Sequence, residues 1–344
     1  MRVVDLRSDT LTRPTASMSR AMAEADVGDD VFGEDPTVNR LEEMAADRMG
    51  KAAALFVTSG TMGNLVSLLV HCARGEEIIL GGSAHTYFFE QGGSAAVGGI
   101  HPRTLTNQTD GKLALADIEA AIRPDNVHFP RTRLIVLENT HNLCNGHPLD
   151  TDYMKAVGAL ARRHGLKIHV DGARIFNAAA ALDVPVATLA SEADSVSFCL
   201  SKGLGAPVGS VLCGSQDFIS EARRARKILG GGMRQAGVLA AAGIVALEEM
   251  VERLADDHAN ARRLAEGLAE MPGVSLDPDQ IRTNIVYFEV NRPDMTTPEL
   301  VQRLDDKGAR MLPVGTGRIR AVTHYHISSE DIEYVLGIAA NILK

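Results

Sequence analysis

This sequence has few cysteines, few aromatic residues, and no long basic or apolar segment. Cysteine occurs four times in 344 residues, without the close pairs that bind structural zinc. Most of these cysteines fall inside apolar runs, so we expect reduced core residues of an intracellular protein and no bound metal. Aromatic side chains make up only 4% of the chain, so the cluster at residues 87–89 stands out.

The charge pattern and the apolar runs exclude further classes of protein. The net charge of −9 argues against a nucleic-acid partner. The longest apolar run, residues 237–247, is too short and too rich in alanine to span a membrane. Asp5 and Arg7 interrupt the N-terminus before an apolar region forms, so we predict no signal peptide. Together these features predict a cytoplasmic protein.

The length and the hydrophobic pattern predict an α/β fold with two domains. Hydrophobic residues make up 45% of the chain, which suits a large domain and a small one. Strand and helix signals alternate up to about residue 229, as in right-handed βαβ crossovers around a mainly parallel sheet. A long alanine-rich helical region follows, and we place the domain boundary inside it, between residues 245 and 246. The remaining strand and helix signals predict a small C-terminal α+β domain.

The N-terminal segment, residues 3–14, is polar, and we expect an arm that contributes nothing to a core. Ser8 and Asp9 lie at a turn of this arm. Further on, Asp35 and Pro36 have the pattern of an N-cap and first residue of a helix that ends at Met49.

One lysine lies where a buried strand gives way to a glycine-rich turn. Residues 195–200 are apolar and strand-like, Lys202 follows them, and glycine and proline prevent a regular continuation. Such a lysine often extends from the strand end into water. The alternative is a partly desolvated amine that forms a Schiff base.

Asp171 ends another strand-like run and favours the second interpretation for Lys202. The carboxyl ends of parallel strands lie at the edge of a sheet where ligands bind, so both residues are expected there. Pyridoxal phosphate needs a lysine for its aldehyde and an acid that keeps its pyridine nitrogen protonated. A lone aspartate at a strand end is more often a cap or a turn former. The two residues together favour the cofactor.

A possible phosphate site lies between the strand at residues 52–57 and the helix after it. The turn contains Ser59, Gly60 and Thr61. The first N–H groups of a helix are unpaired and bind anions. An ordinary N-cap would have the same sequence, so this signal gains weight only beside Asp171 and Lys202.

Two histidines and an arginine are further candidates. His85 follows the strand at residues 77–80, beside the aromatic cluster, where it could stack on a flat ring and exchange a proton. His128 lies in a loop before a strand. Arg320 lies in an otherwise apolar strand, where it could bind a carboxylate or form a structural salt bridge.

Longer strings of residues identify a family. The chain resembles the low-specificity L-threonine aldolases, which belong to the aspartate aminotransferase-like, fold-type I pyridoxal-phosphate enzymes. The resemblance covers essentially the whole chain and is carried by residues 5–10, 28–35, 59–64, 128–132, 138–142, 171–174, 201–202 and 230–237. It implies a three-layer, fold-type I large domain and a small C-terminal domain. It also implies a carbon–carbon lyase that splits L-threonine or L-allo-threonine into glycine and acetaldehyde.

The resemblance also implies roles around the cofactor. Lys202 would bind the aldehyde of pyridoxal phosphate, and Asp171 would pair with its pyridine nitrogen. His85 would stack on the ring, and Gly60 and Thr61 would bind the phosphate.

Around the substrate, the resemblance assigns the carboxylate to Ser8, Arg174 and Arg320, with Arg174 also against the cofactor. His85 and His128 would lie near the substrate hydroxyl. Whether one of these histidines or a bound water is the catalytic base stays open.

The resemblance further implies a homotetramer in which the loop of residues 230–234 reaches the neighbouring subunit's site. Two departures from the family pattern, Phe32 in place of tyrosine and residues 143–145, bear on which aldehyde is accepted. A β-eliminating lyase or a cysteine desulfurase would share Lys202 and Asp171, and Cys144 is the loop cysteine that a desulfurase would need. A nicotinamide dehydrogenase is disfavoured because Gly315 and Gly317 lack a third glycine and lie near the C-terminus.

Overall fold

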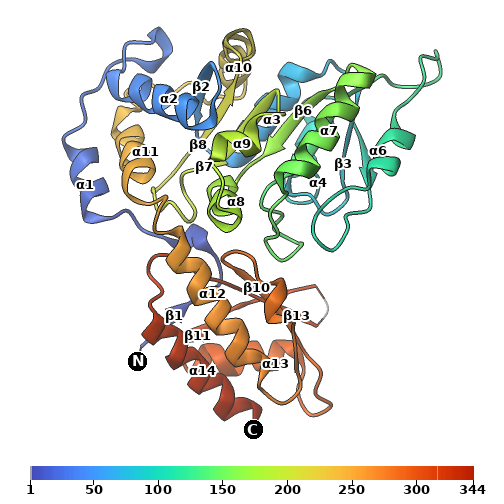
Figure 1. Ribbon diagram of the computed structural model, residues 1–344. Coiled ribbons are helices and arrows are strands. Elements are labelled where there is room, and N and C mark those ends of the chain that lie inside the picture. Colours follow the sequence, from blue (N-terminus) through green and yellow to red (C-terminus); the bar gives the residue numbers. More distant parts are fainter. Residues whose placement is uncertain (1, 316) are drawn as a thin grey trace.

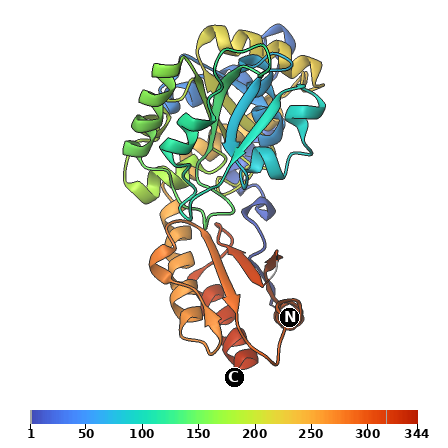
Figure 2. The same cartoon turned by 90° about the vertical axis from the view of Figure 1, so that its right-hand side faces the viewer.

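The computed structural model describes residues 2–315 and 317–344, and it has two lobes. The larger lobe contains the central sheet with helices on both faces, and the smaller lobe contains the C-terminal residues (Figure 1). Figure 2, turned by 90°, shows the same two lobes, with the N-terminal residues beside the smaller one. Within the described residues, no helix combines the length and the apolar character needed to cross a membrane.

The large domain is built on a seven-stranded sheet of order β2-β8-β7-β6-β5-β3-β4. Its strands are β2 (Ala53–Val57), β3 (Glu77–Gly81), β4 (His101–Leu105), β5 (Thr132–Glu138), β6 (Lys167–Asp171), β7 (Ser195–Cys199) and β8 (Ser210–Gly214). All neighbouring strands are parallel except for the two pairs that β8 makes. The predicted mainly parallel sheet is thus confirmed. Because β2 and β7 both run opposite to β8, the carboxyl ends of β2, β3, β5, β6 and β7 meet at one edge.

Helices cover both faces of this sheet. They are α1 (Ala16–Ala23), α2 (Pro36–Met49), α3 (Gly60–His71), α4 (His85–Phe88), α5 (Gly93–Ala96), α6 (Leu115–Ala121), α7 (Thr151–His164), α8 (Ile175–Leu182), α9 (Val186–Ala190), α10 (Gln216–Ile228) and α11 (Gly237–Glu249). Side chains alternate across a strand, so Phe56 enters the core under α2 and α11 while Leu55 and Val57 enter the core under α3 and α10. These are the three layers of the predicted fold. As predicted, α2 begins at Pro36, and the Asp35 side chain accepts from the backbone N–H groups of its first turn.

The small domain has the predicted α+β composition. It contains α12 (Leu254–Ala269), β9 (Val274–Ser275), β10 (Ile285–Val290), α13 (Thr297–Asp306), β11 (Ala309–Arg310), β12 (Leu312–Val314), β13 (Arg318–Val322) and α14 (Ser329–Leu343). Its main sheet is antiparallel, in the order β12-β13-β10-β9. The described residues also form three short 3-10 helices, η1 (Asp9–Leu11), η2 (Asp30–Phe32) and η3 (Pro278–Gln280).

The N-terminal arm corrects one prediction. Val4 and Leu6 are buried in the core of the small domain, although we expected the arm to stay outside any core. They alternate with the charged residues Asp5 and Arg7, so one side of an extended segment is apolar. The short strand β1 (Val4–Asp5) pairs in parallel with β11, which joins the start of the chain to the small domain.

The alanine-rich region forms two helices. α11 packs against α1 and α2 of the large domain, and α12 packs against α14 of the small domain. The predicted boundary between residues 245 and 246 falls within α11. The large-domain core extends to Leu254, and the small-domain core takes over from Ala261.

Candidate active site

A cavity of about 760 Å³ lies between the carboxyl edge of the large sheet and the small-domain strands β10, β12 and β13. It is lined by Ser8, Thr10, Ser83, His85, Phe88, Phe89, Asn142, Leu143, Arg174, Lys202, Tyr287, Leu312, Pro313, Val314, Gly315, Arg318 and Arg320. Five predicted site residues, Ser8, His85, Arg174, Lys202 and Arg320, are therefore brought together here from five separate segments of the chain. The small domain contributes to the cavity through Arg320 and its neighbours.

Lys202 lies in the turn that follows β7. The turn needs glycine at Gly205 and Gly209, whose φ angles of +77° and +98° are strained for other residues. The backbone oxygen of Lys202 accepts hydrogen bonds from Gly205 N at 2.9 Å and from Thr12 Oγ1 at 3.0 Å. In the described part of the chain its amine makes no hydrogen bond, so this half-buried nucleophile is available to the cavity.

Asp171 ends β6, the strand next to β7, and only 2% of the residue is exposed. Its Oδ1 accepts from Ala173 N at 3.1 Å, and its Oδ2 accepts from Asn64 Nδ2 at 2.8 Å. These bonds fix the carboxylate close to His85, which does line the cavity. Asp171 itself is not among the lining residues.

His85, Glu90 and Asp171 form one cluster. His85 Nδ1 lies 2.8 Å from Glu90 Oε1, and the ligand-type atoms of the three residues lie within 4.8 Å of one another. Burial lowers the pKa of His85, but the bond to Glu90 and the charge of Asp171 outweigh it, so the net shift is upward. Burial raises the pKa of Glu90. Although such a set could hold a cation, Asn64 donates to both carboxylates, which satisfies the cluster from within.

The predicted phosphate residues lie at the N-terminus of α3, outside the cavity lining. Ser59 caps the helix by accepting from Met62 N at 3.2 Å. A Cβ on Gly60 would come within 2.9 Å of Cys199 Sγ, so only glycine fits beside the end of β7. The free N–H groups of Gly60 and Thr61 are left at the same sheet edge as Asp171 and Lys202.

Arg174 is committed to a partner that the sequence did not indicate. Its Nε and Nη2 donate to the two carboxylate oxygens of Asp9, both at 2.7 Å, and both side chains are buried. This edge of the guanidinium is therefore occupied by Asp9, and the contact of Arg174 with a substrate carboxylate stays a prediction. Its Nη1 has no partner among the described residues.

Ser8 and Arg320 keep donors for a ligand. The Ser8 hydroxyl oxygen accepts from Thr10 N and Thr10 Oγ1, so its own proton stays free. Arg320 donates to Asn142 Oδ1 at 2.9 Å and to the Arg7 carbonyl at 3.1 Å. Its Nε is buried without a hydrogen-bond partner in the described chain, and the Tyr287 hydroxyl, which is also buried without one, lies near Arg320.

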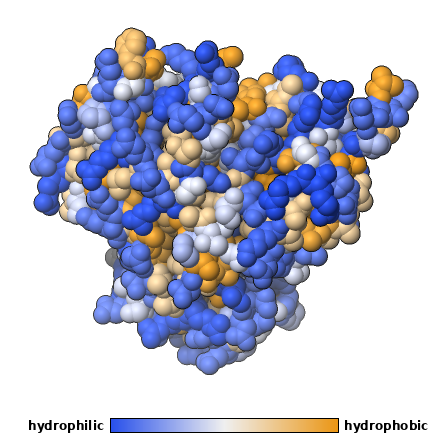
Figure 3. All heavy atoms as spheres, turned by 45° about the horizontal axis from the view of Figure 1, so that its top comes forward, coloured by the Kyte–Doolittle hydropathy of each residue, from blue (hydrophilic) through white to orange (hydrophobic). Residues whose placement is uncertain are grey.

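His128 does not line the cavity of its own subunit. It lies in the loop of residues 122–131, which projects from the large domain (Figure 1). Hydrophobic residues mark the tip of the projection at the upper right of Figure 3, and Val127 is 95% exposed. The role of His128 at a substrate hydroxyl stays a prediction.

The loop of residues 230–234 packs on its own large domain. Arg234 donates to Asp29 Oδ2 at 2.9 Å, and a Cβ on Gly231 would come within 2.4 Å of Met62 Sδ. Phe32, one of the departures noted above, is 73% exposed and outside the cavity, whereas Leu143 of the other departure lines it.

Sequence reasoning missed several residues that hold the site together. Glu138 accepts from the backbone N of His85 at 2.7 Å and of Asn142 at 2.8 Å. Asn142 in turn holds Arg320. Glu138 and Asn142 lie in a string that carried the resemblance, but no pattern within it indicated a partner so distant in sequence.

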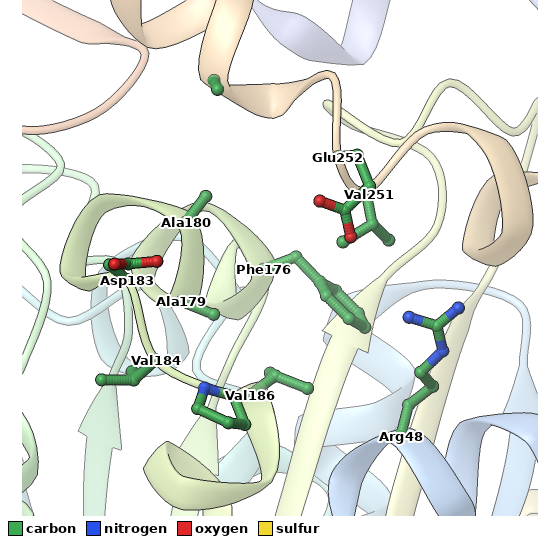
Figure 4. A pocket seen from close by; sticks show the side chains of 11 residues that line it. Arg48, Phe176, Ala179, Ala180, Asp183, Val184, Val186, Val251 and Glu252 are labelled. Carbon is green, nitrogen blue, oxygen red and sulfur yellow. The ribbon is translucent and has the colours of Figure 1, made fainter.

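A second cavity, of about 530 Å³, lies between α8, the end of α2 and the segment that joins α11 to α12 (Figure 4). Phe176 extends into it toward Arg48, and the carboxylates of Asp183 and Glu252 belong to opposite walls. Among the described residues that line it there is no lysine, cysteine or histidine, which are the nucleophile-type side chains that Lys202 represents in the first cavity.

The first site fits pyridoxal phosphate. It offers an unpaired amine at Lys202, a buried acid at Asp171, and a glycine cradle at the start of α3. The buried, unpartnered Nε of Arg320 shows that the cavity lacks an acceptor that a carboxylate would supply.

Comparisons with known proteins agree with this chemistry. The model of the beta-eliminating lyase family matches residues 5–291. The chain is 54% identical to a probable low-specificity L-threonine aldolase 2 of Arabidopsis thaliana, over 98% of the chain and 96% of the relative. It is 46% identical to the low specificity L-threonine aldolase of Escherichia coli K12, over 97% of each. The solved threonine aldolase of Leishmania major has the same fold, with a TM-score of 0.84, 20% identity and 99% coverage of both chains. The chain therefore belongs to the beta-eliminating lyase family and, within it, to the low-specificity L-threonine aldolases.

Proposed function

We propose that this protein is a pyridoxal-phosphate-dependent lyase that cleaves the Cα–Cβ bond of L-threonine, L-allo-threonine and related β-hydroxy-α-amino acids. The products are glycine and acetaldehyde, or the corresponding aldehyde. The observation that carries this proposal is the cavity lined by Lys202, by Arg320 with its unpartnered Nε, and by His85, which is clustered with the buried acids Glu90 and Asp171. Membership in the aldolase family supports the same reaction.

Three elements would hold the cofactor. Lys202 supplies the amine for the aldehyde, Asp171 the charge for the ring nitrogen, and the first turn of α3 the N–H donors for the phosphate. When bound, pyridoxal phosphate supplies an electron sink for the pair released at the substrate Cα. His85, which lies on α4 and is clustered with Asp171, would stack on the ring.

The substrate carboxylate would be held by donors that no protein group uses. These are the Arg320 Nε, the Ser8 hydroxyl and the Arg174 Nη1. Because Asp9 occupies the other edge of Arg174, Arg320 is the main clamp in this proposal. Fixing the carboxylate on this side of the cavity directs the rest of the amino acid toward His85.

His85 would take the proton from the substrate β-hydroxyl. Its Nδ1 is engaged by Glu90, which leaves Nε2 as the nitrogen that can accept a proton. Loss of this proton releases the aldehyde, and a proton returned to Cα gives glycine. The apolar side chains of Phe88, Leu143 and Leu312 line the same cavity and suit aldehydes of differing size.

Several exposed hydrophobic side chains support the expected homotetramer. They include Phe32, Phe88, Val127 and Ile228, the last of which is 82% exposed. In this proposal, the 122–131 loop with His128 and the 230–234 loop meet a neighbouring subunit's site. The four free cysteines suit the expected cytoplasmic location.

Product analysis tests the reaction. Purified protein loaded with pyridoxal phosphate is incubated with L-threonine and with L-allo-threonine, and glycine, acetaldehyde, 2-oxobutyrate and ammonia are measured. We expect equal amounts of glycine and acetaldehyde. Formation of 2-oxobutyrate and ammonia without glycine would identify a β-eliminating lyase instead.

The matched control is Lys202→Ala, which should abolish turnover and the borohydride-trappable link to the cofactor. A reducible adduct elsewhere in the chain would overturn the assignment of Lys202.

A further inference from the structure

A chain of polar side chains runs from Asp171 between the sheet and α3, as far as the C-terminal end of that helix. Asn64 lies one turn into α3 and is 1% exposed, while His169 of β6 and Ser195 of β7 are fully buried. His71, at the end of α3, completes the chain and stacks on the ring of Phe218 at 4.7 Å. The mechanism above uses none of these four polar residues.

Asn64 is the link nearest the site, and all its hydrogen-bonding capacity is used. Its Nδ2 donates to Asp171 Oδ2 at 2.8 Å and to Glu90 Oε1 at 2.9 Å. Its Oδ1 faces Ser197 Oγ at 2.9 Å and His169 Nε2 at 3.1 Å. The two carboxylates fix the orientation of the amide, because the reverse orientation would point its oxygen at two acceptors.

The orientation of Asn64 fixes the proton on His169. Since Asn64 Oδ1 can only accept, His169 Nε2 must carry the hydrogen. Burial lowers the pKa of His169 to about 3, so the ring is neutral and its Nδ1 has a free lone pair. Ser195 Oγ, at 2.8 Å from this Nδ1, must therefore donate to it.

The same reasoning extends to His71. Ser195 has spent its proton on His169, so its oxygen accepts from His71 Nε2 at 2.8 Å. Burial lowers the pKa of His71 to about 4, so this ring is neutral as well. Every donor in the chain thus points the same way, from His71 through Ser195, His169 and Asn64 to the carboxylate of Asp171. Aligned hydrogen bonds of this kind polarise and strengthen one another.

We propose that Asn64, His169, Ser195 and His71 form a positioning relay that orients the Asp171 carboxylate and holds its charge toward the ring nitrogen of the cofactor. The inference rests on the proposed function, in that it assumes a pyridine nitrogen above Asp171. The relay ends on Glu90 as well, so it also orients the partner of His85.

The test compares holoenzyme variants along the relay. His169→Phe removes the donor to Asn64, Asn64→Leu removes the donor to Asp171, and His169→Gln keeps an amide N–H for Asn64. Ser67→Ala is the matched control, because Ser67 is a buried hydroxyl on the same helix without a hydrogen-bond partner in the described chain. Each variant is loaded with cofactor labelled with ¹⁵N in the ring, and its occupancy is read from visible absorption.

The ring-nitrogen chemical shift is the decisive readout. In His169→Phe and Asn64→Leu we expect the ring-nitrogen shift to move toward that of the unprotonated ring. We expect kcat for threonine to fall at least about tenfold, which is the size of effect seen when residues that hydrogen-bond to metal ligands are replaced. KM should change little, because Ser8 and Arg320 are untouched. His169→Gln should recover most of both properties, and Ser67→Ala should match the wild type.

Other outcomes overturn the relay. A wild-type ring-nitrogen shift in both His169→Phe and Asn64→Leu would do so, even if activity fell, because the loss would then follow from stability or occupancy. If Asn64→Leu fails to fold, His169→Phe and His169→Gln decide. If the wild-type enzyme does not cleave threonine, the proposed function fails, but the chemical shift still tests the relay because it needs only bound cofactor.

Discussion

Asp9 of the N-terminal arm and Arg174 at the start of α8 form a buried ion pair with two parallel hydrogen bonds of 2.7 Å. Asn284 of the small domain also donates to Asp9, at 3.3 Å. The pair therefore joins the arm, the large domain and the small domain at the floor of the cavity. The pair uses Nε and Nη2 of Arg174, so within the described chain Nη1 is the one nitrogen left free. Because the guanidinium is planar, the two bonds to Asp9 also fix the direction of Nη1.

Asp9→Asn tests the structural weight of this pair. The substitution leaves a buried guanidinium without its counter-charge, which we expect to lower the free energy of unfolding by about 3–5 kcal/mol. Urea unfolding of the variant and the wild type measures this. As a control, Asp125→Asn removes an exposed partner of Arg131 and should change stability by less than about 1 kcal/mol. Equal loss in the two variants would contradict the prediction.

The same pair predicts a pH dependence. Burial alone would raise the pKa of Asp9, but the charge and hydrogen bonds of Arg174 lower it well below the ordinary value of 3.8. A lowered pKa in the folded state gives stability that is present above the ordinary pKa and is lost as the pH falls below it. The wild type should therefore lose more stability than Asp9→Asn on acidification below about pH 4. Parallel pH profiles of unfolding would contradict this.

Glu90→Gln tests the coupling between Glu90 and His85. The change keeps the side-chain shape and an oxygen for Asn64, but it removes the negative charge that helps to raise the pKa of His85. If His85 acts as the base, activity rises as it loses its proton. The ascending limb of the kcat/KM profile should thus move to lower pH in the variant.

The control for Glu90 is another glutamate–histidine pair. Glu119 Oε1 lies 3.1 Å from His164 Nε2 on the surface. The two residues belong to α6 and α7, and neither lines the cavity. Glu119→Gln should leave the pH profile of the wild type unchanged. A profile that stays in place in both variants would show that His85 is not the titrating base.

The predictable part of this site follows from short-range pattern and sheet topology. Asp171 and Lys202 each end a strand-like run, and consecutive parallel strands end at one edge of the sheet, so their meeting could be predicted. The caps of α2 and α7, an aspartate before the first turn and a glycine after the last, follow from local signals in the same way.

The rest depends on contacts between distant segments. Asp9 and Arg174 are 165 positions apart, and nothing local distinguishes their pairing from a turn residue and a free arginine. Glu90 follows an aromatic cluster with no pattern that indicates its contact with His85. The polar composition of the N-terminal arm predicts a segment outside any core, and two apolar residues are too few to change that prediction. Only the alternation of Val4 and Leu6 with charged residues indicates a strand with one buried side.

Asp171→Asn separates charge from shape at the ring nitrogen. The asparagine keeps the volume, but its single oxygen can accept from Ala173 N or from Asn64 and not from both, because these two donors use different oxygens of Asp171. It cannot hold a proton on the pyridine nitrogen by charge, and a charge-assisted hydrogen bond contributes about 1.5–3 kcal/mol. We therefore expect bound cofactor with kcat lower by at least about tenfold. Near-normal turnover would mean that another acid, such as Glu90, serves the ring.

Arg320 decides whether the small domain takes part in binding substrate. Its Nε is buried without an acceptor, while Asn142 and the Arg7 carbonyl hold its other nitrogens in place. A substrate carboxylate would supply the missing acceptor. Arg320→Ala should therefore raise KM for threonine by about tenfold or more, with the visible absorption of the bound cofactor unchanged. Arg320→Lys should recover only part of this loss, because an ammonium group cannot reproduce the fork of a guanidinium.

The contacts of Arg320 with Asn142 and Arg7 also allow a purely structural role, and Arg318 separates the two. Arg318 lies two residues earlier on β13, donates to Asn145 Oδ1 at 3.1 Å and stacks on Tyr287 at 4.2 Å. Arg318→Ala thus removes an arginine of the same strand and cavity whose contacts are internal to the protein. If Arg320→Ala lowers thermal stability as Arg318→Ala does, with KM intact, Arg320 is structural. The carboxylate would then have to bind to Ser8 and to the one free nitrogen of Arg174. Such a site would bind the carboxylate more weakly, because the negative charge of Asp9 already pairs with the guanidinium of Arg174.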